Sequence, residues 1–239
     1  MQRNLIVTKD GSHTVAIPEW EVSYHSVYGA VQESLHVFIE AGFRHWWSLN
    51  ENASQCVVFE MGFGTGLNAL LTTLEARRRQ RMVVYETVEA FPLEFNLVEK
   101  LNYCYALEES FWQPVFDSLH TCEWNTFHPI TNFFSFKKEK ILLRNYSPSQ
   151  PVDVIYYDAF APAAQPELWT SEVFEKLLAM LAPGGVLVTY CSKGDVRRAM
   201  LAAGFHVEKV AGPIGKREML RATRAEGRRQ RAEIEQGQS

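Results

Sequence analysis

The feature of this sequence that most limits its fold is the stretch VVFEMGFGTGLNAL, residues 57–70. An apolar run ends there, glycines follow at the alternate positions Gly62, Gly64 and Gly66, and a pattern typical of a helix begins at once. Glycine permits positive φ and lets backbone N–H groups approach a ligand without a Cβ in the way. In an open α/β sheet, ligands bind where a strand turns into its helix. The stretch therefore predicts a strand, a ligand-binding loop and a helix.

The same alternation of strand and helix continues along the chain. Apolar runs typical of strands occupy residues 56–61, 82–89, 153–160 and 185–191, and helical patterns occupy 67–80, 93–104, 166–181 and 194–205. This alternation implies parallel strands joined by right-handed crossovers, and hence a doubly wound sheet. Two last strand candidates, 206–212 and 217–223, predict an antiparallel hairpin at one edge. This Rossmann-like α/β outline is that of class I methyltransferases, although many nucleotide-binding proteins share it.

Three parts of the chain are expected. Residues 1–55 are interpreted as an N-terminal extension packed beside the pocket, residues 56–224 as the α/β domain, and residues 225–239 as a basic, polar tail. Within the α/β domain, the aromatic-rich residues 111–145 are predicted to form strands with an inserted aromatic element.

Charge is distributed unevenly. The net charge is −4, yet residues 209–231 carry eight Lys or Arg against two Glu. A basic end on a mildly acidic body is compatible with a polyanionic partner, and a solvated tail is the plainer alternative. The sequence has no signal peptide and no run that would span a bilayer, and its four cysteines form no zinc-binding pattern. We therefore expect a cytoplasmic protein that binds neither a membrane nor a metal.

The glycine motif indicates the class of ligand. A dinucleotide fingerprint reads G-x-G-x-x-G, but here the third glycine falls one residue early, at Gly66. The carboxylate of Glu60, ahead of the glycines, would repel a phosphate, whereas it would attract a cationic ligand. S-adenosylmethionine carries a sulfonium and an ammonium and no phosphate. Glu89, at the end of the second strand, is placed to accept the hydroxyls of a ribose.

A second strand end provides the chemistry. Asp158 ends its strand beside the glycine loop, whereas Asp153 opens that strand and is expected at the far edge. Methyl transfer to an amine requires the nitrogen neutral, its lone pair in line with the methyl, and water kept out. A carboxylate orients such an amine and accepts its proton. Asp158 is therefore the predicted catalytic residue, with Phe160 placed to stack on a base.

Six segments together resemble one family: SYHSVYGAVQESLHVFIEAGF, FEMGFGTGLNALL, TVEAFPL, DVIYYDAFAPAAQPELWT, LVTYCSKGDVRRAMLAAGF and GPIGKREMLRAT. They extend from Ser23 to Thr223, over most of the chain. The glycine motif is common to many methyltransferases, whereas GAVQESLHVF, DAFAP with PELW, and GKREML are far more particular. On these residues the chain resembles the tRNA 5-methylaminomethyl-2-thiouridine methyltransferases of the bacterial wobble-uridine pathway.

The resemblance implies methyl transfer from S-adenosylmethionine to the aminomethyl nitrogen on C5 of the wobble uridine, in the anticodon of tRNA. In some bacteria this module is fused to a FAD-dependent oxidase, and since no second glycine fingerprint follows, the chain resembles the stand-alone form. Asp158 is implied to act on the amine. The positions implied to hold or cover the cofactor are Glu60, Gly62, Gly64, Gly66, Glu89, Tyr24, Glu33 and Ser34.

One segment departs from the family. Many relatives carry Gly-Asp-Ala near the end of the next strand, where the aspartate helps hold the adenine, but this chain reads ILLRNYSP and Asn145 is expected to take that place. His25 and His36 lie in family motifs and are interpreted as structural. The residues expected to contact the tRNA substrate, besides Phe160, are Lys193, Lys216, Arg217 and Arg221.

Two other functions remain open on the sequence. One is a methyltransferase acting on a small-molecule amine, against which the basic hairpin and tail favour RNA. The other is a non-catalytic adenosine-binding or RNA-binding subunit, against which the intact glycine loop and Asp158 argue.

Overall fold

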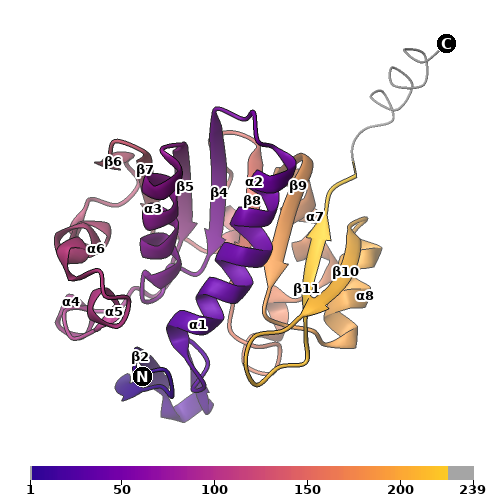
Figure 1. Cartoon of the computed structure of the whole chain (residues 1–239). Coiled ribbons are helices and arrows are strands. Elements are labelled where there is room, and N and C mark those ends of the chain that lie inside the picture. Colours follow the sequence, from indigo (N-terminus) through magenta and orange to yellow (C-terminus); the bar gives the residue numbers. More distant parts are fainter. Residues whose placement is uncertain (1, 226–239) are drawn as a thin grey trace.

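The structure is a computed structural model and describes residues 2–225, so most of the predicted tail, 225–239, lies outside the described residues. Within them the centre is an eight-stranded sheet with helices on both faces (Figure 1). In spatial order the strands are β10 (His206–Ala211), β11 (Glu218–Thr223), β9 (Leu181–Thr189), β8 (Val152–Tyr157), β4 (Gln55–Met61), β5 (Met82–Val88), β7 (Phe134–Glu139) and β6 (His128–Thr131). Strands β9, β8, β4, β5 and β7 run parallel.

The predicted doubly wound fold with a hairpin at one edge is confirmed. β10 pairs with β11 and β11 with β9, both antiparallel. β4 pairs on one side with β5 and on the other with β8, whose register runs from Val58 opposite Val154 to Met61 opposite Tyr157. The chain therefore winds outward from β4 in one direction and then returns to build the other half of the sheet from β8. The carboxyl ends of β4 and β8 form the switch point where such sheets bind ligands.

A long N-terminal helix covers one face of the sheet, beside α3 (Leu67–Arg79). It is continuous through α1 (Ala30–Ser34), the π-helical stretch η2 (Leu35–Arg44) and α2 (His45–Leu49). Gly42 lets it approach β9, because a Cβ there would lie 2.8 Å from Val188 Cγ2. Since Phe38 and Phe43 are completely buried in the same cluster as the strands, this helix is part of the main core. Val15 of the N-terminal sheet belongs to the same cluster.

The opposite face is covered by α7 (Ser171–Met180) and α8 (Gly194–Ala202). Alternate side chains of β4 pack into the cores on the two faces of the sheet. Cys56 and Val58 belong to the core cluster of α3 and the N-terminal helix, whereas Val57 and Phe59 belong to that of α7 and α8. Both faces of the central strands are therefore buried, as in other parallel sheets.

The first residues form a small antiparallel sheet near the start of α1 (Figure 1). Its strands are β1 (Asn4–Val7), β2 (His13–Ile17) and β3 (Val22–Ser23), and the 3-10 turn η1 (Pro18–Trp20) joins the last two. In the pairing of β1 with β2, Leu5 lies opposite Val15.

One helix prediction and one strand prediction require correction. Residues 93–104 form two short helices, α4 (Phe95–Val98) and α5 (Tyr103–Ala106), because the Asn102 side chain between them accepts from His13 N–H and donates to Gly11 C=O. Residues 111–145 begin as a helix, α6 (Gln113–Thr121), where Pro114 is compatible with the first turn. The remaining 3-10 turns are η3 (Ser110–Trp112), η4 (Leu143–Asn145) and η5 (Pro166–Leu168).

Candidate active site

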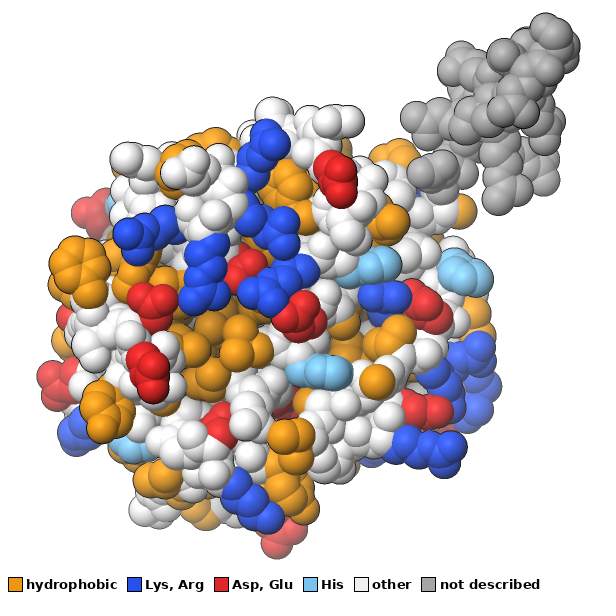
Figure 2. Space-filling model, viewed as in Figure 1, with side chains coloured by type: hydrophobic (Ala, Val, Ile, Leu, Met, Phe, Trp, Pro, Cys, Tyr) orange, Lys and Arg blue, Asp and Glu red, His pale blue; other side chains and the backbone are white. Residues whose placement is uncertain are grey.

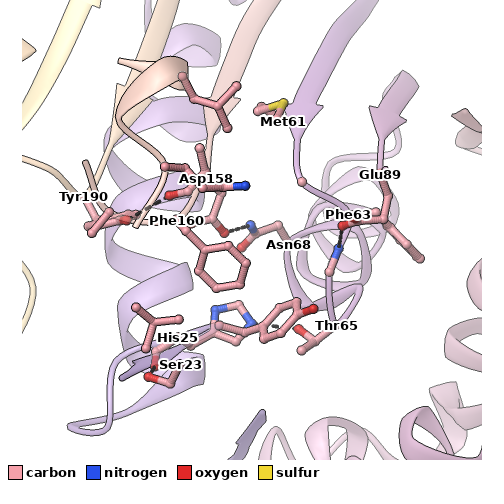
Figure 3. Close-up of a pocket in the computed structure, with 18 of the residues that line it drawn as sticks. Ser23, His25, Met61, Phe63, Thr65, Asn68, Glu89, Asp158, Phe160 and Tyr190 are labelled. Atoms are coloured by element: carbon pink, nitrogen blue, oxygen red, sulfur yellow. Dashed lines mark hydrogen bonds between the residues drawn. The ribbon is translucent and has the colours of Figure 1, made fainter. Parts of the chain in front are cut away.

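A cavity of about 1050 Å³ opens at the carboxyl ends of β4, β5, β8 and β9. Its lining comes from segments far apart in the sequence: the N-terminal sheet and α1, the glycine loop, the segments after β5 and β8, and the loop between β10 and β11. Figure 3 shows side chains from these segments pointing toward one another. The cavity is large enough for a cofactor and part of a substrate together.

The glycine loop uses backbone conformations that favour glycine. Gly62, Gly64 and Gly66 have φ of +92°, +49° and +76°. Gly62 and Gly64 line the cavity, and a Cβ on Gly64 would lie 2.9 Å from the Tyr24 ring. Gly66 is absent from the lining, and a Cβ there would meet His120 Nε2 at 2.5 Å. Gly66 is therefore needed for packing at the start of α3, and its place at the cofactor stays a prediction.

The two predicted cofactor carboxylates lie in different places. Glu89 lines the cavity, where its Oε2 accepts from Gly64 N–H at 3.1 Å and its Oε1 from Phe91 N–H at 2.8 Å. Glu60 instead points into the core, with neither carboxyl oxygen within hydrogen-bonding geometry of a donor, although Thr87, Asn68 and Tyr85 lie close by. Burial, and then the charge of Asp158, raises the pKa of Glu60 well above its usual range. Glu60 therefore lies outside the cavity lining, and its expected contact with a cationic ligand stays a prediction.

Asp158 follows β8 and lines the cavity. Its Oδ2 accepts a hydrogen bond of 2.9 Å from Asn68 Nδ2 (Figure 3). Removal from bulk water, and then the charge of Glu33, raises the pKa of Asp158 to about 7, while the Asn68 hydrogen bond and the Lys216 charge act in the opposite direction. A carboxyl group of this kind changes its protonation state near neutral pH, as a proton acceptor must.

An ion pair joins α1 to the loop between β10 and β11 at the cavity wall. Lys216 Nζ, in the loop between β10 and β11, lies 2.7 Å from Oε1 of Glu33 on α1. The same ammonium lies 4.1 Å from the centre of the Tyr190 ring, and Glu33 Oε2 accepts from Ser26 N–H at 2.7 Å. Lys216 therefore faces the cavity with a carboxylate partner, and its expected contact with the tRNA substrate stays a prediction.

Aromatic side chains form another part of the wall. Phe160 meets Tyr24 edge to face at 5.1 Å and Trp20 at 6.0 Å. Burial raises the pKa of Tyr24 to about 12, so that its hydroxyl keeps its proton. His25 lies deeper, with Nε2 2.7 Å from Thr65 Oγ1, and burial lowers its pKa to about 4. A neutral histidine held in this way has a structural role.

Several predicted residues do not reach the cavity. Ser34 is completely buried on the core side of α1. Asn145 is exposed at the end of η4, because the wall there is built from residues 141–144 and Tyr146 turns inward to stack on Phe59. Lys193 is exposed at the start of α8 and contributes no lining. None of the three lines the cavity, and their roles at the site stay predictions.

The remaining hairpin arginines also lie outside the cavity. Arg217 is exposed, whereas Arg221 is held by Glu208 at 2.6 Å on the neighbouring strand. On the face drawn in Figure 2, basic side chains gather over α3 and the N-terminal helix, with acidic ones between them. There Arg44 and Arg78 both contact Glu75, at 2.6 and 3.1 Å. The basic residues of that face are therefore largely paired.

The sequence interpretation missed three residues of the site. Asn68 was taken only as part of a helix, although a polar residue in the first turn after a glycine loop is a usable signal. Tyr190 directly follows β9 and donates from its hydroxyl to Ala159 C=O at 2.8 Å. Trp20 lines the mouth from the N-terminal sheet, where no sequence motif marks it. Within residues 2–225, no cluster of His, Cys, Asp and Glu is placed to hold a metal ion, and none of the helices suits a membrane span.

Comparison with known proteins agrees with this fold. Residues 135–225 match a family described as S-adenosyl-L-methionine-dependent methyltransferase. In fold, the chain is similar to the crystal structure of MNMC2 from Aquifex aeolicus, with a TM-score of 0.73 and 22% identity over 95% of this chain and 72% of that one. The protein is therefore a class I methyltransferase that uses S-adenosylmethionine.

Curated relatives indicate which group of methyltransferases the chain resembles. The chain is 31% identical to the tRNA 5-methylaminomethyl-2-thiouridine biosynthesis bifunctional protein MnmC of Cupriavidus metallidurans, over 90% of this chain and 33% of that protein. It is also 31% identical to the protein of that name from Aeromonas salmonicida, over 87% of this chain and 33% of that protein. The chain thus spans about a third of the length of these relatives. The chain is therefore similar to one part of these relatives, their methyltransferase part.

Proposed function

We propose that this protein transfers a methyl group from S-adenosylmethionine to the aminomethyl nitrogen on C5 of the wobble uridine in tRNA. The observation that carries the proposal is Asp158, a carboxylate with a pKa of about 7 that Asn68 holds at the wall of a cavity beside the glycine loop. The names of the curated relatives, which refer to 5-methylaminomethyl-2-thiouridine in tRNA, support the choice of amine and of RNA.

The cavity residues fit S-adenosylmethionine. Gly62 and Gly64 leave the backbone bare where an adenosyl group would approach, and a side chain on either would meet protein atoms within about 3 Å. Glu89 presents a carboxylate just after the end of β5, where it can accept hydrogen bonds from the hydroxyls of a ribose. Glu33 and Asp158 supply negative charge for a sulfonium and an ammonium. When bound, the cofactor supplies a methyl group on positively charged sulfur.

The residues of this chain then have three tasks. Asp158 accepts a hydrogen bond from the amine and directs its lone pair at the methyl carbon. As the N–C bond forms and the C–S bond breaks, with its electron pair going to sulfur, Asp158 takes the proton that the nitrogen must lose. Tyr24 and Phe160 exclude water from the reacting atoms, so that the carboxylate acts in surroundings of low dielectric constant.

The direct test uses tRNA whose wobble uridine carries an unmethylated aminomethyl group. Purified protein and S-adenosylmethionine with a labelled methyl group should convert it to the methylaminomethyl nucleoside, detected after digestion to nucleosides. Asp158→Asn, which keeps the shape of the side chain, serves as the matched control. Label on a free small amine and none on tRNA would instead favour the small-molecule enzyme, and cofactor binding without any transfer would favour the non-catalytic subunit.

A further inference from the structure

The mouth of the cavity carries an unusual number of exposed apolar side chains. Of the fourteen large hydrophobic residues exposed within residues 2–225, six line this one cavity. We name them the apolar lip: Trp20, Val27, Tyr28, Phe91, Leu142 and Ile214. Single exposed apolar residues are ordinary on protein surfaces, but a group around one opening marks a binding surface.

The lip is held in place by polar contacts behind it. Arg3 donates to the carbonyls of Phe91 and Pro92 at 2.7 and 3.0 Å. Tyr28 packs against Gly215 of the hairpin loop, where a Cβ would lie 2.8 Å from the ring, and the Lys9 ammonium lies 4.4 Å from the ring centre. The apolar side chains are therefore exposed on a fixed backbone, which reduces the entropy lost on binding.

The position of the apolar lip limits which ligands can bind it. Any amine that reaches Asp158 passes this opening, and Trp20 meets Phe160 on the way inward. A small amine would leave most of the lip in water. Charged residues of both signs border the cavity, among them Arg144 and Lys176 with Glu167 and Glu172, so phosphate binding alone does not explain the surface. Flat apolar groups attached to the amine-bearing nucleotide match it better.

We infer that the apolar lip binds the unpaired nucleobases next to the methylated uridine, with Trp20 as the main stacking residue. The inference rests on the proposed function and adds a surface for the substrate. Bases in single-stranded loops are free to stack on aromatic side chains, whereas paired bases are not. Because stacking is worth more than phosphate contact at this surface, affinity contributed by the lip is nearly independent of salt.

The test compares an anticodon stem-loop containing 5-aminomethyluridine with the free nucleoside. Trp20→Ala should raise both the Kd and the KM of the stem-loop by about fivefold to 150-fold, the range for losing one base stack. The loss should be much larger for the stem-loop than for the nucleoside, the salt dependence of stem-loop binding should stay unchanged, and Trp20→Phe should keep most of the affinity. Phe111→Ala removes an aromatic ring that is 88% exposed and absent from the lining, and it is the matched control.

Ile214→Ser provides a second, independent variant, since Ile214 is 63% exposed in the hairpin loop and has no part in the core. Thermal melting and cofactor affinity show whether each variant is folded. An unchanged stem-loop Kd in folded Trp20→Ala and Ile214→Ser would overturn the inference, as would equal losses for stem-loop and nucleoside. Failure of the proposed function is separate, because wild-type protein would then bind the stem-loop without methylating it.

Discussion

Asn68 Nδ2 donates a 2.9 Å hydrogen bond to Asp158 Oδ2, and this contact ties the first turn of α3 to the end of β8. The hydrogen bond occupies Oδ2 of Asp158 and thereby fixes the orientation of the carboxyl group, including Oδ1. It also favours the ionised carboxylate, so it lowers a pKa that desolvation has raised. The two residues therefore act as one unit, and the pH dependence of the reaction should depend on both.

The wild-type enzyme should lose activity as pH falls through about 7, because the protonated Asp158 cannot accept the proton of the amine. Asn68→Leu should move this acid limb to higher pH, since the hydrogen bond that stabilises the carboxylate is gone. The measurement is kcat/KM between pH 5.5 and 9. An acid limb that stays in place in folded Asn68→Leu would show that Asn68 does not act through Asp158.

Asp158→Ala should lower the single-turnover rate of methyl transfer by about a hundredfold to ten-thousandfold, the range for a positioned acid–base group. Cofactor affinity should change far less, because the glycine loop and Glu89 remain. Rates close to wild type in this variant would move the proton acceptor to another residue, with Glu33 or Tyr24 as the next candidates.

Asp158 should also limit the stability of the fold. Its folded pKa of about 7 lies above the ordinary value of 3.8, so the folded state binds the proton more tightly than the unfolded one and loses stability as pH rises between these values. Asp158→Asn, which cannot ionise, should therefore melt at a higher temperature than wild type at pH 8 and at nearly the same temperature below pH 4. Equal melting temperatures at both pH values would contradict the raised pKa.

Gly64→Val should weaken binding of S-adenosylmethionine at least tenfold, or roughly 1.4 kcal/mol. The branched side chain would enter the space beside the Tyr24 ring at a φ of +49°. Calorimetry measures the affinity. Gly204→Val is the matched control, since Gly204 also has positive φ, +99°, but lies outside the cavity lining. If both variants bind the cofactor equally well, the loop is not the cofactor site.

The hairpin arginines should differ in their effect on tRNA binding. Arg217 is exposed, so Arg217→Ala should weaken binding and reduce the slope of log affinity against log salt by up to about one unit. Arg221→Ala should leave that slope unchanged, because the Arg221 guanidinium contacts Glu208 and Ala41 C=O. Identical slopes for wild type and Arg217→Ala would remove the hairpin from the RNA interface.

The sequence could predict those parts of the fold and site that depend on local pattern. The strand, glycine loop and helix at residues 56–80 follow from one apolar run, three glycines and a helical period, and the hairpin follows from two alternating runs about a turn. Glu89 and Asp158 could be placed because the carboxyl ends of neighbouring parallel strands meet at one edge. These inferences need no knowledge of distant contacts.

Other residues depend on contacts that the pattern does not contain. Both faces of β4 are buried, so its alternation does not tell which side chains reach the cavity, and Glu60 points into the core. The direction of Lys216 is set by Glu33, which lies on a different edge of the fold. Asn145 was chosen by its place in a motif, but the 3-10 turn η4 directs it to solvent.

The Lys216–Glu33 contact spans 183 positions in the chain, and this separation has a consequence for the protein during its synthesis. On the ribosome, the glycine loop and the first parallel strands emerge well before the loop that carries Lys216. A chain at that stage still lacks Lys216 and with it one wall of the cavity. The cavity can therefore close only after the edge hairpin has emerged and its loop has met α1.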